Sequence, residues 1–195
     1  MKYKMIARGF AGFALTLIAS PAMAHLDPAA HGAVAAGFTH PVFGADHVLA
    51  MVAVGIWAAM LGGRAAWAVP AAFVTAMALG FVLSLVGLPL PVVEPLILAS
   101  VIVMGVLVAL AVRVPMAAGM AIVALLALFH GYAHGTEMGG AEAIAYLAGF
   151  ASATALLHSA GLALGLGLAR LSQMTALRGM GGLVAVLGAW LAVAG

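Results

Sequence analysis

Six apolar runs follow one another along the chain, and almost no charged residue interrupts them. Each run is roughly 17 to 25 residues long, which is the length that a helix needs to cross the hydrocarbon core of a bilayer. The runs extend over residues 44–61, 65–86, 93–112, 116–134, 142–168 and 175–194. Short breaks containing glycine, proline or arginine separate them. The sequence therefore predicts an all-α integral membrane protein, a single bundle of six transmembrane helices.

The composition supports this prediction and narrows the chemistry. Charged residues make up 6% and hydrophobic residues 67% of the 195 residues, whereas a soluble domain has about 25% charged residues. The chain contains no Walker-type phosphate loop, so we expect that it does not hydrolyse nucleotide by itself. We also expect no nucleotide partner and no organic cofactor. The chain also contains no cysteine. Any metal site must therefore use nitrogen, oxygen or methionine sulfur.

The first 24 residues are typical of a cleavable secretory signal peptide. Lys2, Lys4 and Arg8 form a positive region, residues 10–18 are apolar, and Ala22-Met23-Ala24 is a small-x-small cleavage site. An uncleaved first helix is the alternative. Cleavage would leave residues 25–195 as one transmembrane domain with a periplasmic N-terminus. Since most of the excess basic charge lies in the signal, we expect no binding to nucleic acid.

Charge is distributed unevenly among the breaks. With a periplasmic N-terminus, all four arginines of the mature chain fall on one side, which the positive-inside rule assigns to the cytoplasm. They are Arg64, Arg113, Arg170 and Arg178. The acids fall on the opposite side, and they are Asp27, Asp46, Glu94, Glu137 and Glu142. We therefore expect a multi-pass protein of a bacterial-type inner membrane. The acidic side chains in the outer half of its helix bundle would attract a cation.

Histidines accompany these acids at the predicted outer side. His130 and His134 are four residues apart and Glu137 follows three residues later, so a helix would place the three side chains on or near one face. His40 precedes an Asp46-His47 pair at the start of the first run. The proline after His40 disfavours helix there, which predicts an irregular segment at this histidine. Ionisable residues in membrane segments indicate function by default.

These residue types predict a site for a divalent transition metal. Imidazole nitrogen and carboxylate oxygen suit borderline ions such as Ni(II), Co(II) and Zn(II). Two carboxylates would neutralise a dication that enters a low-dielectric bundle. The predicted ligands are His40, Asp46, His47, His130, His134 and Glu137. A structural interpretation stays open for some of them, since Asp46 could cap the first helix and the histidines could bond between helices.

Five further residues are candidates for a collecting site or an ion pathway. They are His25, Asp27, His31, Glu94 and His158. The first three could also form a loose polar terminus. Glu94 could have a purely structural role, in which its carboxylate stabilises the positive end of a helix dipole. His158 lies in the middle of the fifth run, where it could relay an ion or form a hydrogen bond to a neighbouring helix.

The two motifs resemble those of the HupE/UreJ family of nickel and cobalt permeases. The first family signature is a histidine, five residues and then Asp-His, and residues 40–47 match it. The second is Phe-His-Gly-x-Ala-His-Gly-x-Glu, which residues 129–137 match throughout. The signal, the six-segment layout and a lone Glu94 extend the resemblance over nearly the whole chain. It implies uptake of Ni(II), or in some members Co(II), from the periplasm through His40, Asp46, His47, Glu94, His130, His134 and Glu137.

Two other functions stay open. An intramembrane metalloenzyme would also hold histidines and carboxylates on membrane helices, although the chain lacks the His-Glu-x-x-His motif of zincins. A membrane accessory protein could bind metal without transporting it. The sequence leaves open the choice between Ni(II) and Co(II), the oligomeric state, and whether the membrane potential or secondary coupling drives the ion.

Overall fold

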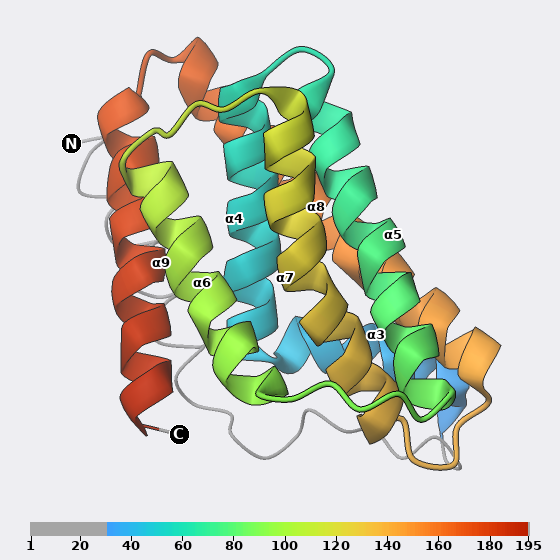
Figure 1. Cartoon of the computed structure of the whole chain (residues 1–195). Helices are drawn as coiled ribbons and strands as arrows, with labels where there is room; N and C mark the ends of the chain where they lie inside the picture. Colours follow the sequence, from blue (N-terminus) through green and yellow to red (C-terminus); the bar gives the residue numbers. More distant parts are fainter. Residues whose placement is uncertain (1–30, 195) are drawn as a thin grey trace.

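The computed structural model describes residues 31–194, so the predicted signal peptide lies outside the described residues, as do His25 and Asp27. All regular secondary structure between residues 31 and 194 is helical (Figure 1). The helices are α3 (Ala33–Phe43), α4 (Ala45–Leu61), α5 (Ala65–Leu85), α6 (Val93–Ala109), α7 (Met116–Glu137), α8 (Ala143–Arg170) and α9 (Met174–Ala194). The all-α prediction is therefore confirmed for this part of the chain.

Each predicted apolar run corresponds to one of the helices from α4 to α9. The helices α5, α7, α8 and α9 are long and apolar enough to cross a membrane. Helix α4 passes the same test only together with α3, to which it is bent by 79°, and α6 is a shorter apolar helix. The chain is a multi-pass helical membrane protein, whereas six complete spans stay a prediction.

The prediction of an irregular segment at His40 is wrong. His40 and Pro41 both lie inside α3, and the chain leaves helical geometry only at Gly44, with φ −81° and ψ 113°. The sharp bend towards α4 follows there. Proline disfavours helix at the preceding residue without forbidding it, and α3 packs tightly on α8, where a Cβ on Gly37 would overlap the carbonyl of Tyr146. Tertiary packing outweighs the local preference.

Helix α4 lies at the centre of the bundle and packs against α5, α6 and α8. Helix α5 pairs with α7, α6 pairs with α9, and α3 packs on α8 across one end of the bundle (Figure 1). Trp57 of α4 is fully buried, and its Nε1 donates a hydrogen bond to the Val112 carbonyl oxygen at 2.8 Å. This bond joins the far end of α4 to the connection after α6, so the central helix is fixed at the end that lies away from α3.

The pairing of α5 with α7 depends on glycine. A Cβ on Gly131 would overlap the carbonyl of Met77, and a Cβ on Gly80 would overlap the carbonyl of Leu128. The two backbones therefore touch where α7 carries the histidines of the second motif. Glycine at position 131 thus allows the close approach of these two helices.

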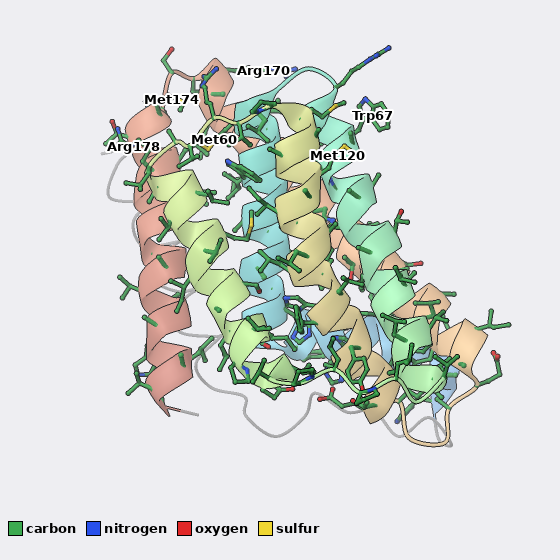
Figure 2. All side chains as sticks on the ribbon, viewed as in Figure 1. Met60, Trp67, Met120, Arg170, Met174 and Arg178 are labelled. Carbon is green, nitrogen blue, oxygen red and sulfur yellow. The ribbon has the colours of Figure 1, made fainter. Side chains whose placement is uncertain are left out.

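The two ends of the bundle carry opposite charge. The connections after α4, α6 and α8 lie at one end, and those after α5 and α7 lie at the other end, beside α3 (Figure 1). Figure 2 shows Arg170 and Arg178 at the first end. At the other end, Asp46 and Glu94 lie in the first turns of α4 and α6, Glu137 ends α7 and Glu142 caps α8. The expected separation of charge is present in the bundle, while its direction across a membrane stays a prediction.

Candidate metal centre

Four histidines from three helices meet near the α3 end of the bundle. His40 comes from α3, His47 from α4, and His130 and His134 from α7, and all four residues are buried. The ring centroids of His134 lie 4.4 Å from His40 and 4.7 Å from His47, and His47 lies 5.0 Å from His130. The bend after α3 thus brings the first motif onto the second.

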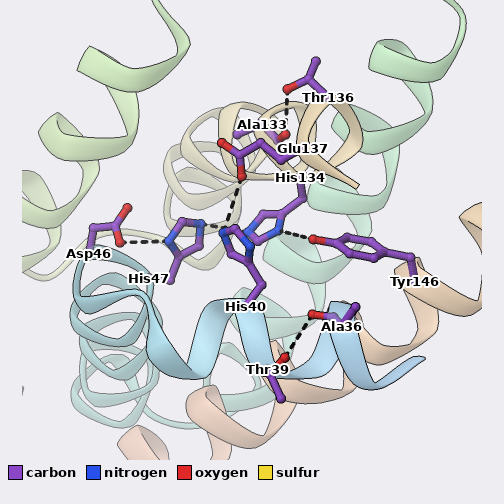
Figure 3. Close-up of polar contacts among 10 residues, drawn as sticks. All are labelled: Ala36, Thr39, His40, Asp46, His47, Ala133, His134, Thr136, Glu137 and Tyr146. Atoms are coloured by element: carbon purple, nitrogen blue, oxygen red, sulfur yellow. Dashed lines mark hydrogen bonds and ion pairs between the residues drawn. The ribbon is translucent and has the colours of Figure 1, made fainter. Parts of the chain in front are cut away.

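The ligand atoms of this cluster face one another (Figure 3). The Nε2 atoms of His47 and His134 are 2.8 Å apart, and His40 Nε2 lies 3.4 Å from Glu137 Oε2. One ligand atom from each of His40, His134 and Glu137 lies within 4.8 Å of the others. With metal–nitrogen bonds of about 2.05 Å, two nitrogens on one ion are about 2.9 Å apart at a right angle and about 3.4 Å apart at a tetrahedral angle. The separations of 2.8 Å and 3.4 Å match pairs of donors on one ion, whereas the ligand atoms that are up to 4.8 Å apart would have to move closer to share it.

Asp46 stands behind His47, and it does not point into the cluster. Its Oδ1 lies 3.0 Å from His47 Nδ1, whereas the other ring nitrogen faces His134. A carboxylate on the far nitrogen of a metal-binding histidine fixes the tautomer and the orientation of the ring. Asp46 does not cap α4, because the N-cap is Gly44 and no side chain caps this helix.

Tyr146 and Phe150 of α8 enclose His134, and the sequence analysis did not identify either residue. The Tyr146 hydroxyl lies 3.4 Å from His134 Nδ1, and the Phe150 ring centroid lies 3.6 Å from that of His134. Both side chains are buried. Their spacing of four residues places them on one face of α8. This spacing of two aromatic residues was the only signal in the sequence that could have indicated an inward-facing pair at the start of the fifth run.

His130 is held by Ser100 of α6, a third residue that the sequence analysis missed. Ser100 Oγ lies 2.6 Å from the carbonyl oxygen of Ile97 and 2.9 Å from His130 Nε2. A hydroxyl has one proton and a carbonyl only accepts, so Ser100 donates to Ile97 and accepts from the Nε2–H of His130. His130 Nδ1 then carries a lone pair, and it has no hydrogen-bond partner among residues 31–194.

The other candidate residues lie away from this cluster. His31 is exposed just ahead of α3, and Glu94 is exposed in the first turn of α6. Within the described part of the chain, no hydrogen bond or ion pair joins Glu94 to the four histidines. His158 is buried in α8, where it contacts Phe73 of α5.

Comparisons with known proteins agree with the two motifs. The chain matches the HupE / UreJ protein family over residues 13–191. It is 46% identical over 199 aligned residues to Protein HupE of Rhizobium leguminosarum bv. viciae, and the alignment covers 99% of this chain and 100% of that relative. No solved structure matches the chain. With the matched region spanning almost its entire length, the chain belongs to the HupE/UreJ family.

Proposed function

We propose that the chain carries Ni(II) or Co(II) inward across the cytoplasmic membrane through the cluster of histidines and carboxylates. The observation that supports this most strongly is the convergence of buried imidazoles from α3, α4 and α7 with Glu137 at one end of an apolar bundle. Ionisable side chains inside membrane helices are rare, and they indicate function by default. Membership of the HupE/UreJ family supports the same assignment.

In this proposal, His40, His47, His134 and Glu137 replace the hydration shell of the ion. Their donor set of nitrogen and carboxylate oxygen suits borderline divalent ions. Asp46 is a positioning residue, which orients His47 and adds negative charge near the ion. Together the carboxylates of Asp46 and Glu137 balance the charge of a dication, so the bound complex has no net charge to bury.

The exposure of the ligands supports entry from the α3 end. The Glu137 side chain is 39% exposed and that of His40 is 9% exposed, whereas His134 is 0% exposed. An ion arriving from this end would meet the carboxylate first and lose water stepwise as it reaches the imidazoles. The positive-inside rule assigns the opposite, arginine-bearing end to the cytoplasm, so the α3 end would face the periplasm.

The test is uptake of radioactive nickel by the purified full chain in sealed liposomes. Nickel should accumulate in the lumen with the native chain. It should enter about tenfold more slowly or worse with Glu137→Gln, because that change removes a charged ligand and keeps the side-chain shape. Glu142→Gln is the matched control, since Glu142 is an exposed acid at the same end that bonds only the backbone of α8. Nickel that binds the native chain without reaching the lumen would contradict transport and support an accessory role.

A further inference from the structure

His158 is buried without any hydrogen-bond partner. Its side chain is 2% exposed, and neither Nδ1 nor Nε2 has a partner among the described residues. The hydrogen bond to a neighbouring helix that the sequence left open is therefore not formed. An unsatisfied buried polar atom destabilises a fold, so an apolar residue would be the more stable choice. Helix packing gives no reason for a histidine at this position.

His158 lies deeper in the bundle than the outer cluster. Helix α8 packs on α4 at this level, because a Cβ on Gly55 would overlap the carbonyl of His158. Gly55 follows His47 by eight residues in α4, which corresponds to about 12 Å along a helix axis. Since α4 runs from the α3 end towards the arginine end, His158 lies between the outer cluster and the proposed cytoplasmic side.

Phe73 of α5 connects the two levels. Its ring centroid is 5.7 Å from that of His130 and 4.9 Å from that of His158. His130 in turn lies beside His47, with a centroid distance of 5.0 Å. Its Nδ1 has no hydrogen-bond partner among residues 31–194. A row of contacting rings therefore runs from the outer cluster to His158, and one aromatic ring stands between the two histidines.

A pocket of about 420 Å³ between α5 and α8, open to the outer surface of the bundle, reaches His158. Its wall also contains Thr75 and Ser159, whose hydroxyls donate to carbonyls of their own helices and keep oxygen lone pairs available. Pro70 has no N–H group, so the Ala66 carbonyl four residues before it receives no helical hydrogen bond from that position. The pocket thus combines an imidazole with oxygen acceptors.

The pocket extends towards the arginine end of the bundle. Trp67, which also lines it, lies at that end of α5 (Figure 2).

We propose that His158 is an inner binding position for the transported dication. The ion reaches it from His130 past Phe73. This inference rests on the proposed transport function and adds a second stop to it. The native chain should then bind two ions, whereas a chain without this imidazole should bind one ion at the outer cluster.

Replacement of His158 separates binding from transport. His158→Phe should fold with unchanged or higher thermal stability, because no hydrogen-bond partner is lost. It should bind one nickel ion by equilibrium dialysis with nearly native affinity, and its uptake into liposomes should fall at least tenfold. Ser152→Ala is the control, since Ser152 lies on α8 outside the pocket and bonds only its own helix. Native uptake by His158→Phe would overturn the inference.

A direct probe uses the absence of cysteine from the chain. Cobalt(II) added to His158→Cys should produce a cobalt–thiolate charge-transfer band, because a thiolate replaces the imidazole as ligand. Ser152→Cys should not produce it. A missing band in folded His158→Cys would overturn the inner site. If the native chain transports no metal while the band is present, the proposed function fails and the inner site stands.

Discussion

The hydrogen bond between His47 and His134 determines how an ion can enter the cluster. Their Nε2 atoms are 2.8 Å apart, so one nitrogen donates and the other accepts. Asp46 lies 3.0 Å from His47 Nδ1 and favours a proton there, which leaves the lone pair on His47 Nε2. His134 is then the donor through Nε2, and its Nδ1 faces the Tyr146 hydroxyl. His134 must move its proton to Nδ1 before both Nε2 atoms can bind one ion.

Tyr146→Phe tests this exchange of tautomers. The change removes the oxygen that would accept a hydrogen bond from protonated His134 Nδ1 when metal is bound. We expect nickel affinity to fall by about 10–100-fold, the usual effect of losing a group that orients a metal ligand. Isothermal titration calorimetry of the purified chain measures it. Tyr132→Phe is the matched control, because Tyr132 lies on α7 outside the cluster, and equal affinities for the two variants would contradict the mechanism.

Substitutions of Asp46 test whether its charge or its contact with His47 matters for nickel binding. Asp46→Asn keeps an oxygen acceptor for His47 and removes the charge, whereas Asp46→Ala removes both. If charge balance dominates, both variants should bind nickel about 10–100-fold more weakly than the native chain. If orientation dominates, only Asp46→Ala should show this loss in the same titration. Native affinity in both variants would exclude any role of Asp46 in binding.

The motif residues could be predicted from the sequence, and their supporting residues could not. The histidines and carboxylates stand out because ionisable side chains are rare in apolar runs. Ser100, Tyr146 and Phe150 are ordinary residues of membrane helices, and they contact the histidines only because α6 and α8 pack beside α7. The spacing of Tyr146 and Phe150 indicates only that they share one face of α8, and no local pattern encodes which residues that face contacts.

At the scale of helices, the contact between α5 and α7 positions the second motif. Gly131 lies between His130 and His134, and a Cβ there would overlap the backbone at Met77. Gly131→Ala should destabilise the fold by about 1–3 kcal/mol, the usual effect of overpacking. It should lower the thermal midpoint in detergent and weaken nickel binding because α7 must shift. Gly182→Ala on α9 is the control, since a Cβ there meets no atom within 4 Å.

The sequence predicted the positions of α4 to α9 to within a few residues, because each apolar run ends at glycine, proline or arginine. It missed α3. The reason is physical, since Pro41 favours extended backbone before it, and the helix is stabilised by its packing on α8. This element matters for the site because the 79° bend after it brings His40 over His134.

At the scale of the whole molecule, the bundle separates its charges along one axis. The arginine-bearing connections lie at one end, and the carboxylates and the histidine cluster lie at the other. For the proposed inward transport, the membrane potential is a sufficient source of energy. A dication gains about 4.6 kcal/mol per 100 mV of membrane potential, twice the value for a single charge. This sustains about a thousandfold accumulation or more.

Transport should therefore be electrogenic. In liposomes loaded with potassium, valinomycin should set an interior-negative potential and raise the initial rate of nickel uptake, and reversing the potassium gradient should lower it. A pH gradient imposed without a potential is the control, because it changes only the driving force on protons. Uptake that follows the pH gradient and ignores the potential would mean that each dication exchanges for two protons. The histidines of the cluster would then carry the counter-ions, and the charge separation along the bundle would serve insertion rather than transport.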